Sequence, residues 1–201
     1  MTEEIKKSNK ITIIMLIVMF VSPVVLSWFI FNYTDFLSMR GTSNKGDLIE
    51  PIKPLGELEL TDPFNDERKD SLYGKWSLVY VSSSCEKTCM DNVYTIRQIH
   101  TMMDKHSLRV QRVLLLKDQA PDELKEKLAE YVGQQFINNE LVDVNDLVAK
   151  FKLNETDSPL DAARIYIVDP LGNLMMSFEP GTNPKAIYKD LKKLLRGSRI
   201  G

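Results

Sequence analysis

Two cysteines, Cys85 and Cys89, are the residues of this 201-residue chain whose types and spacing best suit a chemical site. The sequence holds no other cysteine, and the two lie four positions apart. On one helical face that spacing brings the Cβ atoms to about 5–6 Å from each other. With a slightly unwound turn, the sulfurs could bond to each other or bind one soft metal ion. A structural disulfide is the alternative, although such a short loop constrains the unfolded chain little.

The elements around the two cysteines place them at a strand-to-helix turn. Residues 76–81 (WSLVYV) form an apolar run of strand length, three serines follow, and a helical pattern covers residues 86 to about 105. In an open α/β sheet, sites form beyond the carboxyl ends of the strands. The helix N-terminus and Lys87 favour a thiolate there, whereas Glu86 opposes it. The sequence therefore predicts redox or metal chemistry at Cys85 and Cys89.

The remaining elements predict an α/β domain. An apolar run of strand length covers residues 110–116, and a helix is expected from Pro121 to its stop at Gly133, with an apolar stripe of Leu124, Leu128 and Val132. A β-hairpin is predicted at residues 164–168 and 173–178, which flank an Asp-Pro-Leu-Gly turn. A last helix is expected to start at Asn183-Pro184. This order predicts a mostly parallel central sheet, flanked by helices and closed by an antiparallel hairpin.

A membrane anchor is expected ahead of this domain. Residues 11–31 carry no charge over a length that spans a bilayer's hydrocarbon core as a helix. A cleaved signal peptide is the alternative, but its apolar core is usually shorter and no small-x-small cleavage site follows. The predicted parts are a cytoplasmic N-terminus at 1–10, a transmembrane helix at 11–31 in contact with the lipid bilayer, a linker at 32–56 and a folded domain at 57–201.

The lysines near this segment predict its orientation. Lys6, Lys7 and Lys10 precede it, whereas only Arg40 and Lys45 follow within about 15 residues. This excess favours a cytoplasmic N-terminus and a domain outside the cytoplasm, where disulfides persist. The N-terminal residues lack the character of a mitochondrial transit peptide, so we expect a single-pass protein of a bacterial inner membrane with a periplasmic domain.

Composition excludes several functional classes. A net charge of −2 is too even for a protein that binds nucleic acid by neutralising phosphates, so no nucleic-acid partner is expected. Two cysteines and two histidines are too few for a four-cysteine or multi-histidine zinc site. His100 lies about 16 Å along the helix from Cys89, and we interpret it as a partly buried core residue. His106 is interpreted as a C-terminal cap or a solvated residue.

The segment GKWSLVYVSSSCEKTCM, residues 74–90, resembles the SCO/SenC family of cytochrome c oxidase assembly proteins. The resemblance extends to ELTDP at 59–63, to PDELKEKLAEYV, and to ARIYIVDPLGNLMMSF as the family's late hairpin. It implies a membrane-anchored, thioredoxin-like domain, with cytochrome c oxidase subunits or copper chaperones as partners. It also implies copper as a cofactor, held by Cys85, Cys89 and a histidine before the hairpin.

The sequence departs from that family at two positions. Met90 stands where members usually have a proline, and Asp161 stands nine residues before Pro170, the place of the histidine ligand. Cu(I) prefers thiolate, thioether or imidazole to a carboxylate, so the departure weakens a three-ligand copper site. Ordinary thioredoxins carry CxxC and a cis-proline about where Ala163 stands, which favours the SCO-like branch.

Three functions follow as hypotheses. Thiol-disulfide exchange needs only the cysteine pair and loses nothing without the histidine, so Cys85 and Cys89 are the expected catalytic residues. The second hypothesis is that both thiolates bind and deliver Cu(I), helped by Met90 or a partner's ligand. A non-catalytic assembly scaffold is the third.

Overall fold

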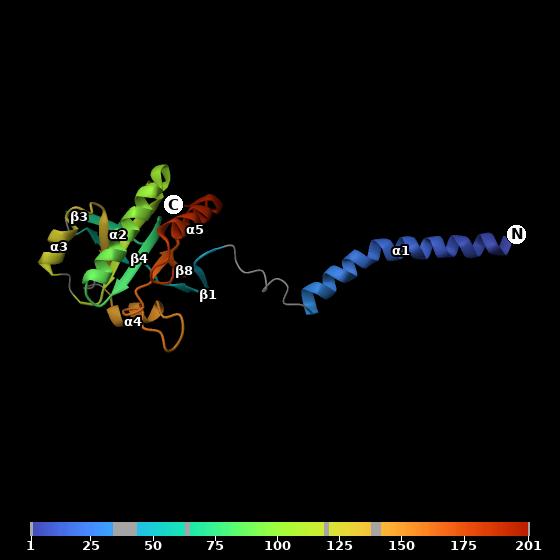
Figure 1. Cartoon of the computed structure of the whole chain (residues 1–201), viewed down its shortest axis with the longest axis horizontal. Coiled ribbons are helices and arrows are strands. Elements are labelled where there is room, and N and C mark those ends of the chain that lie inside the picture. The colour runs from blue at the N-terminus through green and yellow to red at the C-terminus, as the bar shows by residue number, and fades with distance from the viewer. Residues whose placement is uncertain (1, 34–43, 63–64, 119–120, 138–141, 201) are drawn as a thin grey trace. The chain divides into compact units, whose positions relative to one another are not determined.

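A computed structural model describes residues 2–33, 44–62, 65–118, 121–137 and 142–200. The chain divides into two units, Met1–Ser43 and Asn44–Gly201. Helix α1 (Thr2–Tyr33) of the first unit includes Pro23 (Figure 1). Within it, Lys10–Asn32 is long and apolar enough to cross a membrane, with a mean hydropathy of 2.7. This span covers the predicted anchor at 11–31.

The second unit is built on one eight-stranded sheet with the order β1-β8-β7-β4-β5-β6-β2-β3. The strands are β1 (Asp47–Pro54), β2 (Glu59–Asp62), β3 (Asn65–Ser71), β4 (Trp76–Ser82), β5 (Val110–Leu116), β6 (Gln134–Ile137), β7 (Ile165–Val168) and β8 (Asn173–Phe178). The helices of this unit are α2 (Lys87–Met102), the 3-10 helix η1 (Asp104–Arg109), α3 (Asp122–Leu128), α4 (Val144–Lys150) and α5 (Pro184–Gly197).

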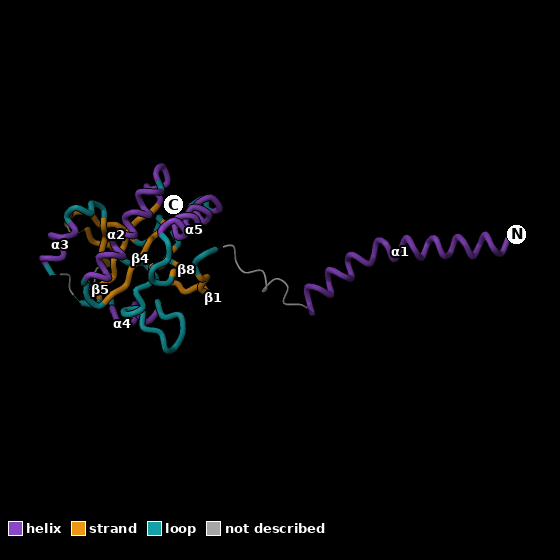
Figure 2. The backbone as a smooth tube through the Cα atoms, viewed as in Figure 1, coloured by secondary structure: helices purple, strands orange, loops and turns teal. Residues whose placement is uncertain are grey.

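Both faces of the sheet are covered by helices (Figures 1 and 2). Every residue of β4 and β5 is buried, which explains why these strands have continuous apolar runs rather than an alternating pattern. Leu78 and Tyr80 belong to the core that the sheet forms with α2, α3 and α5. Val79 and Val81 point to the opposite core, formed with α4. The two faces follow from the alternation of side chains along a strand.

The predicted centre of the sheet is present, and antiparallel strands extend it on both sides. β5 pairs in parallel with β4 and with β6, whereas the other five strand pairs are antiparallel. The sheet is therefore mixed rather than mostly parallel. The predicted hairpin is confirmed, because β7 and β8 pair antiparallel around the turn at 169–172.

The N-terminal edge of the sheet includes part of the predicted linker. Residues 47–54, predicted to lie in the linker at 32–56, form β1 and pair with β8. Ile49 and Leu55 are buried with exposed fractions of 6% and 2%, and they join the α4-side core. Prolines and charged residues dominate this segment, and its few apolar positions were too sparse to predict a strand.

Helix α3 is shorter than predicted. It begins beside Pro121 as expected but ends at Leu128 instead of continuing to Gly133. Val132, predicted to lie on its apolar stripe, is 82% exposed. Gly133 has a φ of +81° and directs the chain into β6, a strand that the sequence did not predict. Because residues 134–137 pair with β5 as strand β6, the helix has to end before them.

The turn of the β7–β8 hairpin depends on Gly172. Its φ is +77°, and an added Cβ would lie 2.6 Å from Tyr73 Cε1 and 3.2 Å from the Gly56 carbonyl oxygen. We expect Gly172→Ala to lower the free energy of unfolding by about 1–3 kcal/mol, measured by urea unfolding of the full chain in detergent. Gly74 has a φ of +84°, and an added Cβ there would meet no other atom. Gly74→Ala therefore adds backbone strain without a steric clash and should lower the free energy of unfolding by less. Equal losses in the two variants would contradict the steric argument.

Candidate functional site

A disulfide joins Cys85 and Cys89 beyond the carboxyl end of β4. Their Cα atoms lie 5.0 Å apart. Cys85 lies in the turn before α2 and is partly buried against the core, whereas Cys89 lies in the first turn of α2 and is only 2% exposed. The turn is held by the Ser82 hydroxyl, which donates to the Ser84 carbonyl oxygen at 2.7 Å. The two cysteines therefore differ in access, with Cys85 the more open.

The backbone amide groups at the start of α2 favour a thiolate. Cys89 is the third residue of the helix, and the first turn holds no acidic residue. Glu86 occupies the N-cap position, but its side chain makes no capping hydrogen bond. The exposed amide groups and the helix dipole stabilise a thiolate at such a position. Reduction of the bridge would thus release a pair in which a thiolate is stabilised.

A cavity of about 270 Å³ opens beside the disulfide. It is lined by Tyr80, Ser82, Ser83, Ser84, Glu86, Lys87, Thr88, Cys89, Leu160, Asp161 and Ala163. Burial raises the pKa of Tyr80 above its usual value, although hydrogen bonds with Asn92 and Ser82 oppose the shift. The phenol is therefore neutral at ordinary pH. Most of the lining is polar, so water and a polar ligand can both occupy the cavity.

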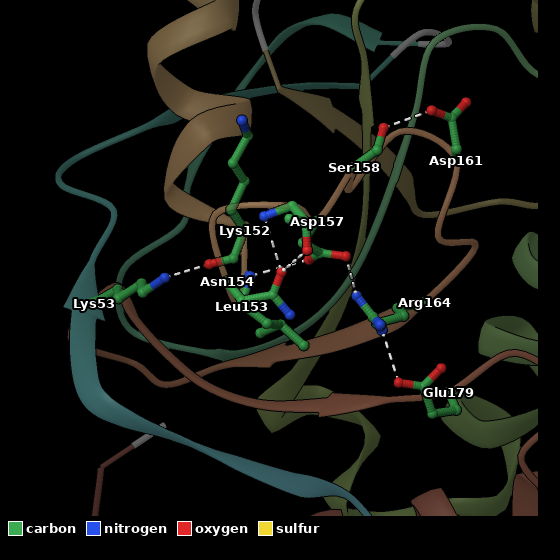
Figure 3. A network of polar contacts seen from close by, with 10 residues as sticks. Lys53, Lys152, Leu153, Asn154, Asp157, Ser158, Asp161, Arg164 and Glu179 are labelled. Carbon is green, nitrogen blue, oxygen red and sulfur yellow. Dashed lines mark hydrogen bonds and ion pairs between the residues drawn. The ribbon is translucent and has the colours of Figure 1, made fainter.

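Asp161 contributes a carboxylate to the same cavity as Cys89. The Ser158 hydroxyl donates to Asp161 Oδ2, and the Asp161 amide donates to the Ser158 carbonyl oxygen at 3.1 Å (Figure 3). These bonds close a turn that holds the carboxylate in one orientation. The position that the family resemblance assigned to a histidine ligand thus lines the same cavity as Cys89, but it carries a carboxylate.

An ion-pair network holds the loop that carries Asp161 (Figure 3). Arg164 Nη1 lies 2.7 Å from Asp157 Oδ1, and Arg164 Nε lies 2.9 Å from Glu179 Oε1. The Leu153 amide donates to Asp157 Oδ2 at 3.0 Å. Burial alone would raise the pKa of Asp157, but the hydrogen bonds from Leu153 and Arg164 outweigh it and hold that pKa below its usual value. The network fixes both ends of the loop between α4 and β7.

Ala163 adopts a strained backbone conformation beside the disulfide. Its φ is +49°, in the left-handed region that residues with a Cβ rarely adopt. Such strain persists where the surrounding structure imposes it and is frequent at functional sites. Arg164, next in the chain, is held by both of its ion pairs. The network therefore stabilises a strained segment on the wall of the cavity.

The histidines lie away from the disulfide, as the sequence predicted. His100 is partly buried near the end of α2, where its Nε2 lies 3.1 Å from the Val110 carbonyl oxygen and 3.2 Å from that of Ser107. Burial and then the charge of Arg112 lower the pKa of His100, so the ring is neutral at ordinary pH. His106 is in the last turn of η1. Met90 is partly buried against the core and does not line the cavity.

The residues around Cys85 and Cys89 do not fit a three-ligand copper site. No group of three or more histidine, cysteine or acidic residues that could hold a metal occurs in the part of the chain that the structure describes. The carboxylate of Asp161 is a hard ligand that Cu(I) disfavours. The two sulfurs alone could bind Cu(I) after reduction.

Sequence reasoning found the cysteines and the place of Asp161 but missed the residues that hold it. The residues of this network come from different parts of the chain: Asp157 is in a loop, Arg164 directly precedes β7 and Glu179 directly follows β8. No local sequence pattern links them. The S-x-x-D spacing of Ser158 and Asp161 is typical of a side chain that closes a turn and could have been recognised.

A family model described as "Transmembrane-like, thioredoxin-like, C-terminal domain" matches residues 76–198. No curated protein matches the chain. Solved structures share its fold at low identity. Copper-bound yeast Sco1 has a TM-score of 0.55 and 18% identity, covering 71% of this chain and 92% of its own. Copper-bound ScoI of Bradyrhizobium japonicum has a TM-score of 0.52 and 19% identity, covering 69% and 97%.

A third similar structure is described by its disulfide. BsSco, "a member of the Sco family of cytochrome c oxidase assembly proteins" with an identified "disulfide switch", has a TM-score of 0.50 and 13% identity. It covers 70% of this chain and 92% of its own. The fold is thus the thioredoxin-like fold of the Sco1/SenC structures. Because the family model matches more than half of its residues, the chain belongs to the family of transmembrane-like, thioredoxin-like C-terminal domains.

Proposed function

We propose that the protein is a membrane-anchored thiol-disulfide exchange protein that assists the assembly of cytochrome c oxidase. The observation that carries the proposal is the Cys85–Cys89 disulfide, with a partly open Cys85 and a buried Cys89 at the start of α2. A bridge across so short a loop contributes little to stability, so a static structural role explains it poorly.

The exchange uses the two cysteines in turn. In the dithiol form, the Cys85 thiolate attacks a partner's disulfide, forms a mixed disulfide and releases one partner thiolate, which takes up a proton. Cys89 then loses its proton and attacks the Cys85 sulfur, which releases the second partner sulfur as a thiol. Two electrons pass to the partner, and the chain returns to the disulfide form. A dithiol reductant outside the cytoplasm must then reduce the Cys85–Cys89 bond again.

The remaining parts of the proposal concern location and partners. The apolar span Lys10–Asn32 supports an anchor. The lysine excess before it supports a cytoplasmic N-terminus and a periplasmic domain at a bacterial inner membrane. The fold shared with BsSco, from the Sco family of oxidase assembly proteins, supports oxidase subunits or copper chaperones as partners. The proposed exchange would reduce their cysteines so that these can take up copper.

The proposal is tested on the full chain in detergent, reduced and then freed of reductant. Uncharged bis(2-hydroxyethyl) disulfide should oxidise it, as followed by alkylation of free thiols and mass measurement. Cys85→Ser should abolish the reaction, because the buried Cys89 cannot reach the reagent. Cys89→Ser should stop at a mixed disulfide on Cys85. A reduction potential near −200 mV is expected for an exchanger, whereas one well below about −300 mV would contradict the proposal.

Binding and delivery of Cu(I) is the second candidate function. Copper is present in the yeast Sco1 and Bradyrhizobium ScoI structures of the same fold. With Asp161 in place of an imidazole, we expect the reduced chain to bind Cu(I) no more tightly than a small dithiol does, in competition with a colourimetric Cu(I) chelator. Tight binding that Cys85→Ser removes would favour copper delivery instead. Full oxidase assembly by the Cys85→Ser/Cys89→Ser variant would favour a scaffold over both.

A further inference from the structure

Three cavities follow α2 from the disulfide to its C-terminal end. The cavity beside Cys89 shares Thr88 and Ala163 with a second cavity of about 310 Å³. The second shares Pro184 with a third of about 560 Å³, which reaches Met102. The three neighbouring cavities are named here together the α2 groove. Its near end is lined by Cys89, which is bonded to Cys85, and its far end lies near the last turn of the helix.

The half of the α2 groove nearest the disulfide is acidic. Its charged lining residues are Glu86, Lys87, Asp91, Asp161 and Glu179. Four carboxylates therefore face one ammonium group. Glu179 shares its charge with Arg164, but its side chain is still 58% exposed. The remaining carboxylates belong to exposed residues, so this half attracts cations.

The far half of the α2 groove is basic and partly apolar. Arg97 and Lys185 line it together with Tyr94, Met102 and Pro184. Tyr94 is 48% exposed. The Arg97 guanidinium lies 4.8 Å from the centre of the Tyr131 ring, which restrains it at the groove. This half suits a segment that presents an acidic side chain beside an apolar one.

We propose that the α2 groove binds an extended segment of a partner polypeptide, with a basic residue beside its reactive cysteine and an acidic residue farther along. The proposal rests on the exchange function proposed above and adds the substrate class. From Cys89 to Arg97, the basic residue that α2 supplies to the far half, the helix rises by about 12 Å, the length of about four residues of extended chain. The acidic residue should therefore lie about four residues from the cysteine.

The charge pattern should act mainly on the encounter of the two proteins. Complementary charges along a groove increase association rates and suppress wrongly charged partners. The groups are exposed, so salt at about 1 M, with a Debye length of about 3 Å, should remove most of the effect. Binding in the α2 groove should therefore make the exchange rate depend on both the order of charges in the partner and the salt concentration. The chemistry at Cys85 alone would not.

The test uses the reduced full chain in detergent and short peptides whose single cysteine is capped by 2-mercaptoethanol as a mixed disulfide. Each reaction yields the Cys85–Cys89 disulfide, the free peptide thiol and 2-mercaptoethanol. One peptide carries lysines beside the cysteine and glutamates about four residues away. The other peptide exchanges these positions, and both are made in each chain direction. We expect the first order to react at least about tenfold faster at low salt, and at nearly the same rate as the second at high salt.

Two variants and a control locate the effect. Asp91→Lys in the near half and Lys185→Glu in the far half should each reduce the preference severalfold, when each peptide rate is divided by the rate of the same variant with bis(2-hydroxyethyl) disulfide. Glu57→Lys is the control, because Glu57 is exposed and close to Gly56, whose carbonyl oxygen lies near the hairpin turn. That turn is at the start of β4, opposite the disulfide.

The outcomes distinguish the two proposals. If the uncharged disulfide is not reduced, the proposed exchange function fails. If it is reduced but the two peptide orders react at equal rates at low salt, exchange stands and the assignment of the α2 groove is overturned. A preference that Glu57→Lys alters as much as Asp91→Lys does would also overturn it, because the effect would then come from net charge.

Discussion

Arg164→Met is expected to lower the free energy of unfolding by about 3 kcal/mol, since it leaves a buried carboxylate without its cation. The Asp157 side chain is 7% exposed, and that of Arg164 is 16% exposed, with 2.7 Å between their charged atoms. Methionine preserves much of the side-chain volume but removes the charge. Urea unfolding of the full chain in detergent at pH 7 measures the loss.

The same variant should change how stability depends on pH. In the natural chain the folded-state pKa of Asp157 lies below the ordinary value of 3.8, so the folded state binds fewer protons than the unfolded state. Its contribution is complete above pH 3.8 and is lost as the pH falls through the lower folded-state pKa. Without Arg164 the folded-state pKa of Asp157 should rise, so the difference in unfolding free energy between the natural chain and the variant should shrink as the pH falls below 3.8.

A matched control is available in an exposed ion pair. Lys125 lies 3.2 Å from Asp122, with side chains that are 45% and 93% exposed. Lys125→Met should cost less than about 1 kcal/mol, because water screens the pair. If Arg164→Met costs no more than Lys125→Met, the network of Figure 3 does not stabilise the loop as we infer.

Asp161→His is expected to increase the affinity of the reduced chain for Cu(I) at least about tenfold. The substitution places an imidazole in the cavity that Cys89 lines, and imidazole is a ligand that Cu(I) accepts, unlike a carboxylate. Competition of the full chain against a colourimetric Cu(I) chelator measures the affinity.

Asp161→Asn is the control for this experiment. It removes the negative charge, as the histidine variant does, but supplies no soft ligand, so its Cu(I) affinity should stay close to that of the natural chain. If the asparagine and histidine variants gain equally, the change comes from charge and not from a third ligand. If neither gains, the carboxylate position is not oriented toward the sulfurs.

Much of the central fold was predictable from the sequence, because its signals are local. The continuous apolar runs of β4 and β5 are typical of strands buried on both faces, and both were predicted. Asn183 caps α5 as predicted, with its side chain accepting a hydrogen bond from the Lys185 amide. The interpretation of His100 as a partly buried residue was also correct.

The edge strands were not predictable, because they form only by pairing with strands that are distant in the sequence. β1 was assigned to a linker, and β2, β3 and β6 were not expected as strands. β2 pairs with both β3 and β6, so its place depends on residues about 75 positions away, such as Phe136 beside Thr61. A short segment with one buried face carries too few apolar positions to indicate a strand by itself.

For the site, the sequence by itself determined the chemistry available, because residue type and local spacing fix it. Two cysteines four apart after a buried strand predicted a pair able to form a disulfide or to bind one soft metal ion, and Asp161 in place of a histidine weakened the copper site. Only the tertiary structure decided what surrounds the disulfide. β7 pairs antiparallel with β4, with Ile165 opposite Tyr80, so the start of β7 lies beside the end of β4. That pairing brings Asp161 and Ala163 to the cavity that Cys89 lines, and no local pattern encodes a cavity shared by residues more than 70 positions apart.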